Sequence, residues 1–574
     1  MTFKLIIGKL TEADLSNDRV IALDSFVKEI INNKNTNCKI QNQPFLDSIK
    51  RNETSIYLNN LSEKIISELK FKLNSLNKVN YGTDDWKIIV GPWLNNFLKI
   101  SHNRFYKIKR VLSENDISEV TAFNYKDENF TLIDNLQLNE VSNNVEWNAI
   151  MYSKIISFLK PNINIMFENL NTNFSRTKKI SIKSIFKNFI SFLLSFLIKK
   201  NDALIVHPYL PYFENIKLNF FLKQFPQSWR LFKLVDKKYD IELRKKIILK
   251  NSENDFEMFM SKIIPSSLPI CHIESFNKLK TIIDNSHLPK NPKFIFTSNN
   301  YEYDEVFKLY VVLKKKNKST YIVGQHGSYI SSIENMFFKE SHAADYYLDW
   351  GKNGFDSNQD GFNLKLINKS IKNDKNGKIL ILDSPYGTNN KTFNRMDENI
   401  IKEKFLHTLI SSIDKDLHKN IILKLHTSYK QRDKTYLSKI KSICPDIKIE
   451  TDNKIIFKLF KKARCVIHTY DSTGIYETMT FNIPTFCIWP NELNHVQQKY
   501  QQYYNILKKN NVLFFEPKYL AEKINSFYSN LDMWWLKTET KEAINIFLNQ
   551  FSNIPNNNST KVLAKKLIEL SRPR

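Results

Sequence analysis

The sequence predicts an α/β protein with two Rossmann-like domains facing a central cleft and a helical N-terminal part. Short apolar runs alternate with helical patterns between 203 and 330, and a second alternating series begins near 371. Such alternation is typical of parallel sheets covered by helices. The chain has 574 residues, more than one hydrophobic core usually organises, so we expect two domains.

The N-terminal domain is predicted to span 1–370. Its first 200 residues are predicted to be helical, because stretches such as LSEKIISELKFKLNSL repeat apolar residues at spacings of three and four. Over 201–370 we expect a Rossmann-like part, with strands at 203–207, 293–298 and 320–327. The polar stretch that begins at 371 marks the boundary to the next domain.

A C-terminal Rossmann-like domain is predicted over 371–530. Its apolar runs lie at 378–387, 420–429, 447–450, 465–474 and 484–490, and most of them precede a helical pattern. Residues 531–574 are expected to form helices that pack back on the body of the protein. Ligands in open parallel sheets lie beyond the carboxyl ends of the strands, so the polar residues at these ends are the candidate site residues.

The charge balance of 85 basic against 59 acidic residues gives a formal net charge of +26. Such a field attracts nucleotides, nucleic acid or an anionic membrane, although lysines scattered over solvated faces give the same count. Five widely spaced cysteines without a C-x-x-C pair suit a reducing compartment. The N-terminus is a poor signal peptide, so we expect a cytoplasmic protein. The segment 177–200 is either a buried helix or a basic amphipathic helix on an anionic surface.

The run CVIHTYDSTGIYE carries the most informative strand end. Ser472 and Thr473 can cap the helix that follows, whose N–H groups and dipole suit a phosphate. Glu477 lies one turn further and could accept hydrogen bonds from ribose hydroxyls. The alternative is an ordinary capped helix with a surface glutamate.

Two further strand ends in this domain extend the candidate nucleotide site. His426 follows the run at 420–425, beside Lys424, and an imidazole next to a lysine is a plausible phosphate clamp, although a lone histidine is more often structural. Ser384 and Gly387 belong to the loop after the first strand, where glycine permits close backbone approach. No histidine and carboxylate cluster has metal-ligand spacing, so neither a metal nor a cofactor is predicted.

In the N-terminal domain the sequence YIVGQHG ends a predicted strand with a histidine held between glycines. His326 would lie uncovered at the cleft, where an imidazole can accept a proton from a hydroxyl, unless it is a hydrogen-bonded structural residue. Asp304 and Glu305 are alternative bases. The acceptor-side candidates are Gln325, Asn299 and Asn300.

The order of several motifs resembles a family of surface-polysaccharide transferases whose genes accompany those for lipopolysaccharide and nonulosonic-acid sugars. The motifs are GPWL (91–94), NRF (103–105), EWNAIMY (146–152), FTSNNYEYDEVFK (296–308), QHGSY (325–329), ESHAADYYLDWG (340–351) and MWW (533–535). This chain departs from the family at Ser328 and Ile330, where a glycine-rich continuation is expected.

More distantly, the layout is similar to GT-B glycosyltransferases, including bacterial sialyltransferases and Kdo transferases. Those enzymes hold CMP with a His-Pro motif, matched here by His426 with Thr427 in place of proline, and with a Ser-Ser or Ser-Thr motif, matched by Ser472 and Thr473. The resemblance extends to CDP-glycerol and polyol-phosphate transferases of teichoic-acid synthesis, which use a histidine in an HG motif.

These resemblances imply a metal-independent glycosyltransferase that moves a CMP-activated Kdo-type or nonulosonic acid onto a surface polysaccharide or lipopolysaccharide. The partners would be a nucleotide-sugar donor, a glycan or lipid-linked acceptor and the inner face of the cytoplasmic membrane. One alternative is a CDP-polyol phosphotransferase. The other is a non-enzymatic basic protein that binds nucleic acid, which would interleave basic and exposed aromatic residues along one face rather than place polar residues at strand ends.

Overall fold

The protein is described here by a computed structural model. It covers residues 2–8, 17, 19–23, 39–40, 48–170, 172, 174, 196–227, 229, 232, 238–250, 252–327, 329–333, 343–352, 361–385, 395–431, 435–452 and 455–572. The predicted site residue Gly387 and most of the segment 177–200 lie outside this part of the chain.

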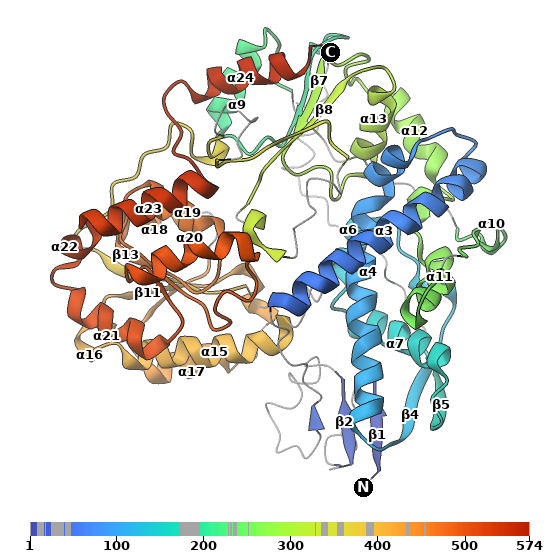
Figure 1. Ribbon diagram of the computed structural model, residues 1–574, viewed down its shortest axis with the longest axis horizontal. Coiled ribbons are helices and arrows are strands. Elements are labelled where there is room, and N and C mark those ends of the chain that lie inside the picture. Colours follow the sequence, from blue (N-terminus) through green and yellow to red (C-terminus); the bar gives the residue numbers. More distant parts are fainter. Residues whose placement is uncertain are drawn as a thin grey trace.

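Three parallel sheets organise the described chain (Figure 1). The first has the order β3-β2-β1-β4-β5, with β1 (Phe3–Ile6), β2 (Val20–Ala22), β3 (Lys39–Ile40), β4 (Ile117–Asn124) and β5 (Asn164–Asn169). The second has the order β6-β7-β8-β9, with β6 (Leu204–Val206), β7 (Phe294–Thr297), β8 (Thr320–Gly324) and β9 (Tyr346–Leu348). The third has the order β12-β11-β10-β13-β14-β15, with β10 (Lys378–Leu382), β11 (Ile421–Lys424), β12 (Lys448–Glu450), β13 (Ala463–His468), β14 (Thr485–Ile488) and β15 (Leu513–Phe514). This mixed α/β architecture with parallel sheets is consistent with the Rossmann-like α/β part of the predicted fold class.

Helices cover these sheets. Those of the first part are α3 (Ser48–Asn77), α4 (Thr83–Glu114), α5 (Asp127–Phe130), α6 (Asn135–Val141) and α7 (Val145–Leu159). Those around the second sheet are α9 (Tyr212–Phe221), α10 (Ile241–Lys245), α11 (Asp255–Ser267), η2 (Ile270–His272), α12 (Phe276–Asp284), α13 (Glu305–Lys315), η3 (Tyr329–Ser331) and η5 (Leu364–Leu366). Those of the last part are α15 (Arg395–Ser412), α16 (Lys415–His418), η6 (Thr427–Gln431), α17 (Tyr436–Ile443), α18 (Ile456–Lys462), α19 (Thr473–Thr480), α20 (Gln498–Lys509), α21 (Pro517–Phe527), α22 (Leu531–Trp535), α23 (Thr538–Phe551) and α24 (Ser559–Leu570).

The expectation of a helical N-terminal part needs a correction. The long helices α3 and α4 are present and pack against each other, but the same region also builds the sheet β1–β5. Three of its strands have four residues or fewer, and β4 follows them only after both long helices. Strands this short carry too little alternation to be separated from the surrounding polar sequence.

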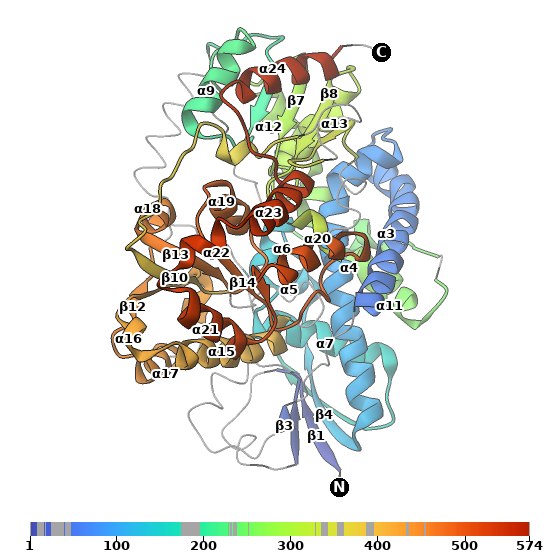
Figure 2. The same cartoon turned by 60° about the vertical axis from the view of Figure 1, so that its left-hand side comes forward.

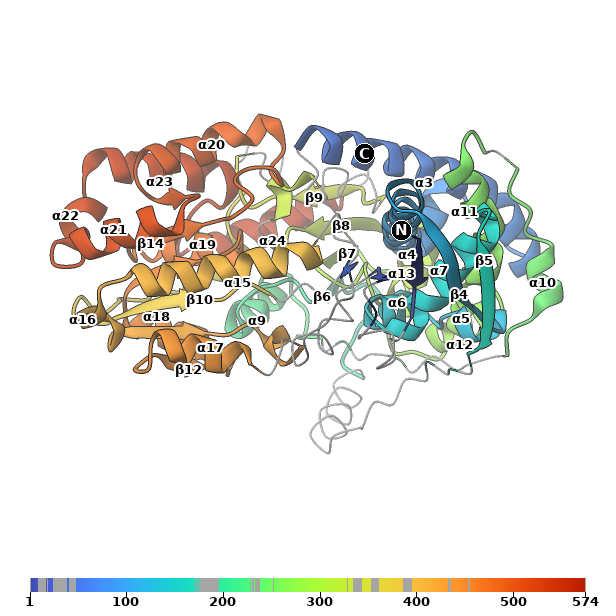
Figure 3. The same cartoon turned by 90° about the horizontal axis from the view of Figure 1, so that it is seen from below.

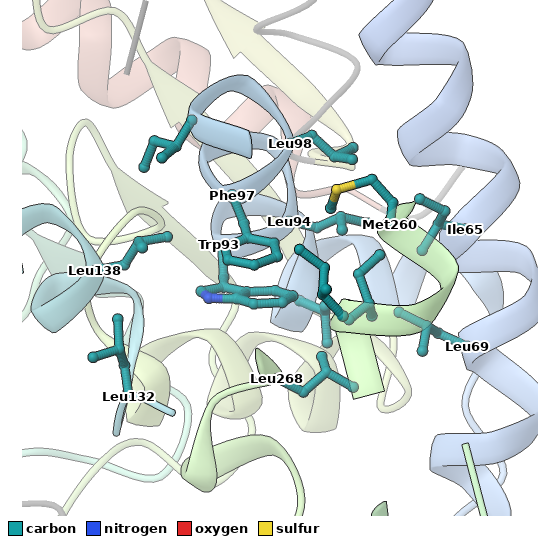
Figure 4. Packing of buried hydrophobic residues seen from close by; sticks show 14 of the residues in the cluster. Ile65, Leu69, Trp93, Leu94, Phe97, Leu98, Leu132, Leu138, Met260 and Leu268 are labelled. Carbon is teal, nitrogen blue, oxygen red and sulfur yellow. The ribbon is translucent and has the colours of Figure 1, made fainter. Parts of the chain in front are cut away.

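The motif GPWL lies inside α4 and belongs to a hydrophobic core rather than to a site. Trp93 and Leu94 are fully buried, and the Trp93 ring stacks on Phe97 with a centroid distance of 4.9 Å. Figure 4 shows these rings packed among Ile65 and Leu69 of α3 and other apolar side chains. Pro92 is accommodated within the helix.

The four-stranded sheet β6–β9 is apolar on both faces. Val206 and Val323 face the core that α3, α4 and α13 share, whereas Ile205, Phe296 and Ile322 belong to the core that continues into the C-terminal part. The alternation follows from the period of two in a strand. A view from below places this sheet between the β10–β15 part and the β1–β5 part (Figure 3).

The C-terminal helices connect the parts of the chain. Helix α23 packs on α19 and α20, and α24 packs on α9, beside which it lies in both Figure 1 and Figure 2. Between them, the backbone of 550–553 pairs with the segment after β9, where the Lys352 N–H donates to the Gln550 carbonyl and the Asn553 N–H to the Trp350 carbonyl. In α22, Trp534 stacks on Phe486 of β14 at 4.7 Å.

Replacing Gly351 by alanine should destabilise this junction. A Cβ atom at Gly351 would lie 2.0 Å from the Gln550 backbone oxygen, so one of the two segments must shift. Overpacking of this kind costs about 1–3 kcal/mol, which should lower the melting temperature in differential scanning fluorimetry. Lys352→Ala is the control, because that exposed position already carries a Cβ. Equal melting temperatures for the two variants would contradict this account.

Candidate functional site

The strand order of the third sheet predicts where a ligand can bind. Counted along the chain, the order is 3-2-1-4-5-6, with β10 in the centre, so successive strands are added first on the β11 side and then on the β13 side. The winding therefore reverses between β10 and β13, which run parallel with Leu382 opposite His468. In such sheets the ligand crevice lies beyond the carboxyl ends of the strands at this reversal.

The turn from β13 into α19 is built around a neutral histidine. His468 is fully buried, and burial lowers its pKa to about 3. Its Nε2 lies 3.1 Å from Thr478 Oγ1, and its Nδ1 lies 3.4 Å from Ser472 Oγ. A Cβ atom at Gly474 would lie 2.9 Å from the imidazole, so this close packing requires glycine. His468 thus fixes the predicted Ser-Thr turn to its strand.

Helix α19 begins at Thr473, and its start suits an anion. Ser472 is the N-cap residue but makes no side-chain hydrogen bond to the first turn, because its hydroxyl faces His468. The N–H groups of the first turn and the positive end of the helix dipole therefore lie beyond the carboxyl end of β13, on one side of the switch point. Ser384 follows β10 on the other side of this switch point and is buried.

His426 follows β11 and has a defined hydrogen-bond geometry. Its Nδ1 accepts from the Ser428 backbone N–H at 3.2 Å and lies 2.8 Å from Ser428 Oγ. In the neutral ring the proton must then reside on Nε2, which becomes a donor. Lys424, in contrast, is buried and donates to the Leu425 carbonyl at 2.6 Å, and desolvation lowers its pKa. Of the two, His426 is the better phosphate donor.

Lys365 joins the two halves of the candidate site and escaped the sequence prediction. Its ammonium pairs with the buried carboxylate of Glu477, one turn into α19. It also acts on His326 at the end of β8: burial lowers the pKa of His326, Glu302 opposes this, and Lys365 lowers it further. The Lys365 side chain is one-third exposed, and its charge acts on residues from the C-terminal and the N-terminal parts of the candidate site. In the structure Glu477 is the ion-pair partner of Lys365, and its predicted contact with ribose requires this ion pair to open.

His326 occupies the edge of the second sheet that the sequence predicted. It is half-buried, its ring meets Tyr209 edge-on at 5.2 Å, and its Nδ1 lies 3.4 Å from the Tyr301 hydroxyl. The preceding Gln325 has a structural role, because its carboxamide donates to the Gly327 carbonyl and accepts from the Trp350 N–H. Gln325 thus holds the turn that carries His326.

The loop after β7 contains the other acceptor-side candidates. Thr297 Oγ1 accepts from the backbone N–H groups of Asn299 and Asn300. Asp304 is the N-cap of α13 and accepts from the Phe307 N–H at 3.0 Å. Burial raises the pKa of Asp304 to about 6. Its carboxylate is committed to neighbouring donors and does not reach solvent as a free base.

Glu305 belongs to the core rather than to the site. It is 2 % exposed, and its Oε2 lies 2.8 Å from both His272 Nε2 and Lys308 Nζ. Burial opposes its ionisation, but Lys308 and His272 together lower its pKa to about 2. Cys271, His272 and Glu305 also bring possible metal ligands within 4.8 Å of one another. The Lys308 ammonium already supplies positive charge at the shared oxygen, so this group is a buried ion pair.

A latch ties the loop after His326 to the loop before α19. Ser331 Oγ lies 2.8 Å from the Tyr504 hydroxyl of α20, which donates to Asp471 Oδ2 at 3.1 Å. The backbone contributes as well, since Ser332 bridges Val496 in antiparallel fashion. His326 and Ser472 are therefore held in register by a hydrogen-bonded chain between the two sheets. Sequence reasoning missed this latch because its members lie up to 173 residues apart.

Replacing Tyr504 by phenylalanine should loosen this latch. Loss of the hydroxyl leaves Asp471 and Ser331 without their shared partner, at a cost of about 1–3 kcal/mol. Hydrogen exchange should accelerate at the Gln497 and Ile333 amides, which pair with the Ser331 and His495 carbonyls. Tyr503→Phe is the control. Tyr503 lies in α20 next to Tyr504, and its half-buried ring packs on Phe551 of α23. Unchanged exchange in Tyr504→Phe would contradict the latch.

Comparison with known proteins supports an enzymatic assignment. Residues 3–567 match the LIC12162 family of transferases, which covers nearly the whole chain. No curated protein gives a significant match. Among the described helices, none combines the length and apolar character that crossing a bilayer requires. The chain belongs to the LIC12162 family of transferases.

Proposed function

We propose that this transferase is a glycosyltransferase of GT-B type, which moves a sugar from a nucleotide-activated donor to a hydroxyl of a surface glycan. The observation that carries the proposal is Lys365, which pairs with Glu477 near the switch point of the third sheet and whose charge also lowers the pKa of His326 at the edge of the second sheet. A cation at such a junction is suited to a phosphate that leaves during transfer.

The donor would bind at the reversal between β10 and β13. Its phosphate would contact the first turn of α19, with Ser472 and Thr473, and would accept from His426 Nε2. Ser384 would line the opposite side. Displacement of Lys365 toward the phosphate would release Glu477 to accept from ribose hydroxyls. We propose CMP as the nucleotide, with a Kdo-type or nonulosonic acid as the sugar, because of the motif resemblance at His426 and Ser472.

The acceptor would bind at the carboxyl edge of β6–β9. His326 would contact its hydroxyl there, and its lowered pKa keeps the imidazole neutral near pH 7. The acceptor oxygen would bond to the anomeric carbon, while the bond from that carbon to the phosphate oxygen breaks and its electron pair leaves with the nucleotide. In this proposal Lys365 and the α19 N-terminus supply the positive charge, so the transfer needs neither a metal nor a cofactor.

A thermal-shift screen against CMP, CDP, UDP and GDP tests the donor. We expect CMP to raise the melting temperature most, since a ligand at 100 times its Kd adds about 2.7 kcal/mol. His426→Ala should reduce this shift. The exposed His287 in the N-terminal part offers a matched control, and His287→Ala should retain the shift.

A preference for UDP or GDP would contradict the donor assignment and leave the fold unaffected. A preference for CDP, followed by product analysis in which phosphate travels with the transferred group, would establish the polyol phosphotransferase instead. Absence of any nucleotide effect, together with salt-sensitive DNA binding, would favour the nucleic-acid-binding alternative.

We also propose that the protein contacts the anionic inner face of the cytoplasmic membrane near the end of α9. Phe220, Phe221 and Phe225 are exposed there. Gln224 exchanges hydrogen bonds with the backbone of Ala203, so these rings lie near the exposed Lys199 and Lys200. Apolar rings beside lysines match the interface of an anionic bilayer.

Vesicle sedimentation tests this membrane contact. Lys199→Ala with Lys200→Ala should weaken partitioning into phosphatidylserine vesicles by about 30-fold, because each basic residue near the surface contributes about 1 kcal/mol. Lys70→Ala with Lys72→Ala, around the exposed Phe71 of α3, is the matched control. Equal partitioning of both double variants and the wild type would show that this face does not contact the membrane.

A further inference from the structure

The backbone just after β6 is strained, at residues that have no role in the transfer proposed above. His207 has a φ of 45° and Tyr209 a φ of 63°, and Pro208 separates them. Both angles lie in the left-handed region, and a residue before proline normally prefers extended backbone. Such positions cost about 1–3 kcal/mol and persist where the surroundings hold them, often at functional sites. His207 is exposed, so the strain is not explained by burial of its side chain in the core.

A chain of polar groups holds the His207 ring. His207 Nδ1 is hydrogen-bonded to Asn300 Oδ1. The Asn300 Nδ2 group donates to Asp304 Oδ2 at 3.1 Å, and the Trp229 indole N–H donates to the same oxygen at 2.6 Å. The Phe307 N–H occupies the other carboxylate oxygen. Asn300 and Asp304 are both 6 % exposed, so this chain is shielded from water.

The chemistry of this chain fixes the tautomer of His207. An ionised carboxylate only accepts, so Asn300 must turn its NH₂ group to Asp304 and its carbonyl oxygen to His207. The carbonyl oxygen cannot donate, so His207 must carry its proton on Nδ1. The neutral ring then presents a lone pair on Nε2, which is the arrangement of a proton acceptor.

His326 is arranged differently at the same edge of the sheet. It ends β8, whereas His207 ends β6, and Tyr209 connects them because its ring meets His326 edge-on. The Tyr301 hydroxyl lies 3.4 Å from His326 Nδ1. His326 is suited to hydrogen bonding an acceptor, while His207 has the orientation that proton removal needs.

We infer that His207 is the general base of the acceptor site, with Asn300 and Asp304 as the residues that position it. The inference rests on the proposed function and names its substrate class, a carbohydrate hydroxyl. His207 Nε2 takes the proton of that hydroxyl as its oxygen bonds to the anomeric carbon, and the nucleotide leaves with the electron pair of the broken bond. The Asp304 carboxylate, acting through the Asn300 dipole, stabilises the imidazolium that forms.

Chemical modification tests the tautomer without any substrate. Diethyl pyrocarbonate reacts with an unprotonated imidazole nitrogen, and mass spectrometry reports the rate at each histidine. We expect rapid modification of His207. In Asp304→Asn the new NH₂ group would face the two donors that Asp304 Oδ2 now accepts from, the Asn300 NH₂ group and the Trp229 N–H. The Asn300 carboxamide should therefore rotate and turn its own NH₂ group to His207. His207 would then accept at Nδ1 and carry its proton on Nε2. The modification rate of His207 should then fall by about tenfold or more, while the rate at the exposed His287 stays unchanged.

Turnover tests the catalytic role with CMP-N-acetylneuraminate as the probe. His207→Gln should lower kcat for CMP release by about 10²- to 10⁴-fold, the usual contribution of a general base. The CMP thermal shift and the KM for the donor should be retained. Because His207 is exposed, this variant should fold.

Two results would overturn the inference. One is a His207 modification rate that Asp304→Asn leaves unchanged, and the other is a His207→Gln variant with kcat within threefold of the wild type. If the wild type neither binds CMP nor releases it, the proposed donor is wrong. The modification experiment still decides whether His207 is held as a proton acceptor.

Discussion

The burial of both faces of the sheet β6–β9 is the constraint on which the proposed site depends. Because Val206 and Val323 face one core and Phe296 and Ile322 the other, this sheet cannot rotate without exposing apolar surface on one side. Its carboxyl edge is thereby fixed with respect to the C-terminal part. The latch through Tyr504 and the ion pair of Lys365 then join two edges that hydrophobic packing has already positioned.

The sequence predicted much of the C-terminal part, since each apolar run there is bounded by turn residues. The runs containing Leu382, Leu425 and His468 all end in polar residues, and in the structure these ends lie on three neighbouring strands. Alternation and turn residues are local signals, so they predict strands and their ends without any knowledge of tertiary contacts. The same signal marks His207, which follows the apolar run at 203–206 as His326 and His426 follow theirs.

Residues whose roles depend on distant partners could not be predicted. Lys365 lies in the short 3-10 helix η5, and only the packing of that element near α19 brings it to Glu477. Glu305 is predicted as an alternative base, yet in the structure it lies in the core as an ion-pair partner of Lys308 and His272. Asn300 bonds both to Asp304 and to His207, which lies 93 positions earlier in the sequence. Such pairings depend on the topology of the fold, and the periodicity of the sequence does not predict them.

Several motifs that carry the resemblance to transferases hold the scaffold together. In EWNAIMY, Trp147 stacks on Phe130 at 5.0 Å, and Asn148 accepts from the buried Arg104 of the NRF motif at 2.9 Å. In MWW, Trp535 donates to Asn482 at 2.9 Å. These contacts fix the positions of helices, whereas the candidate site residues lie at the ends of strands.

The proposed function requires a nucleotide that binds at the reversal of the third sheet, near the edge of the second. A crystal structure of the protein with CMP bound would locate this nucleotide. We expect its phosphate at the first turn of α19, in contact with His426 or Lys365, and its cytidine beside β10. Density for the nucleotide at the β1–β5 sheet, or at a surface remote from both His426 and Lys365, would contradict this proposal.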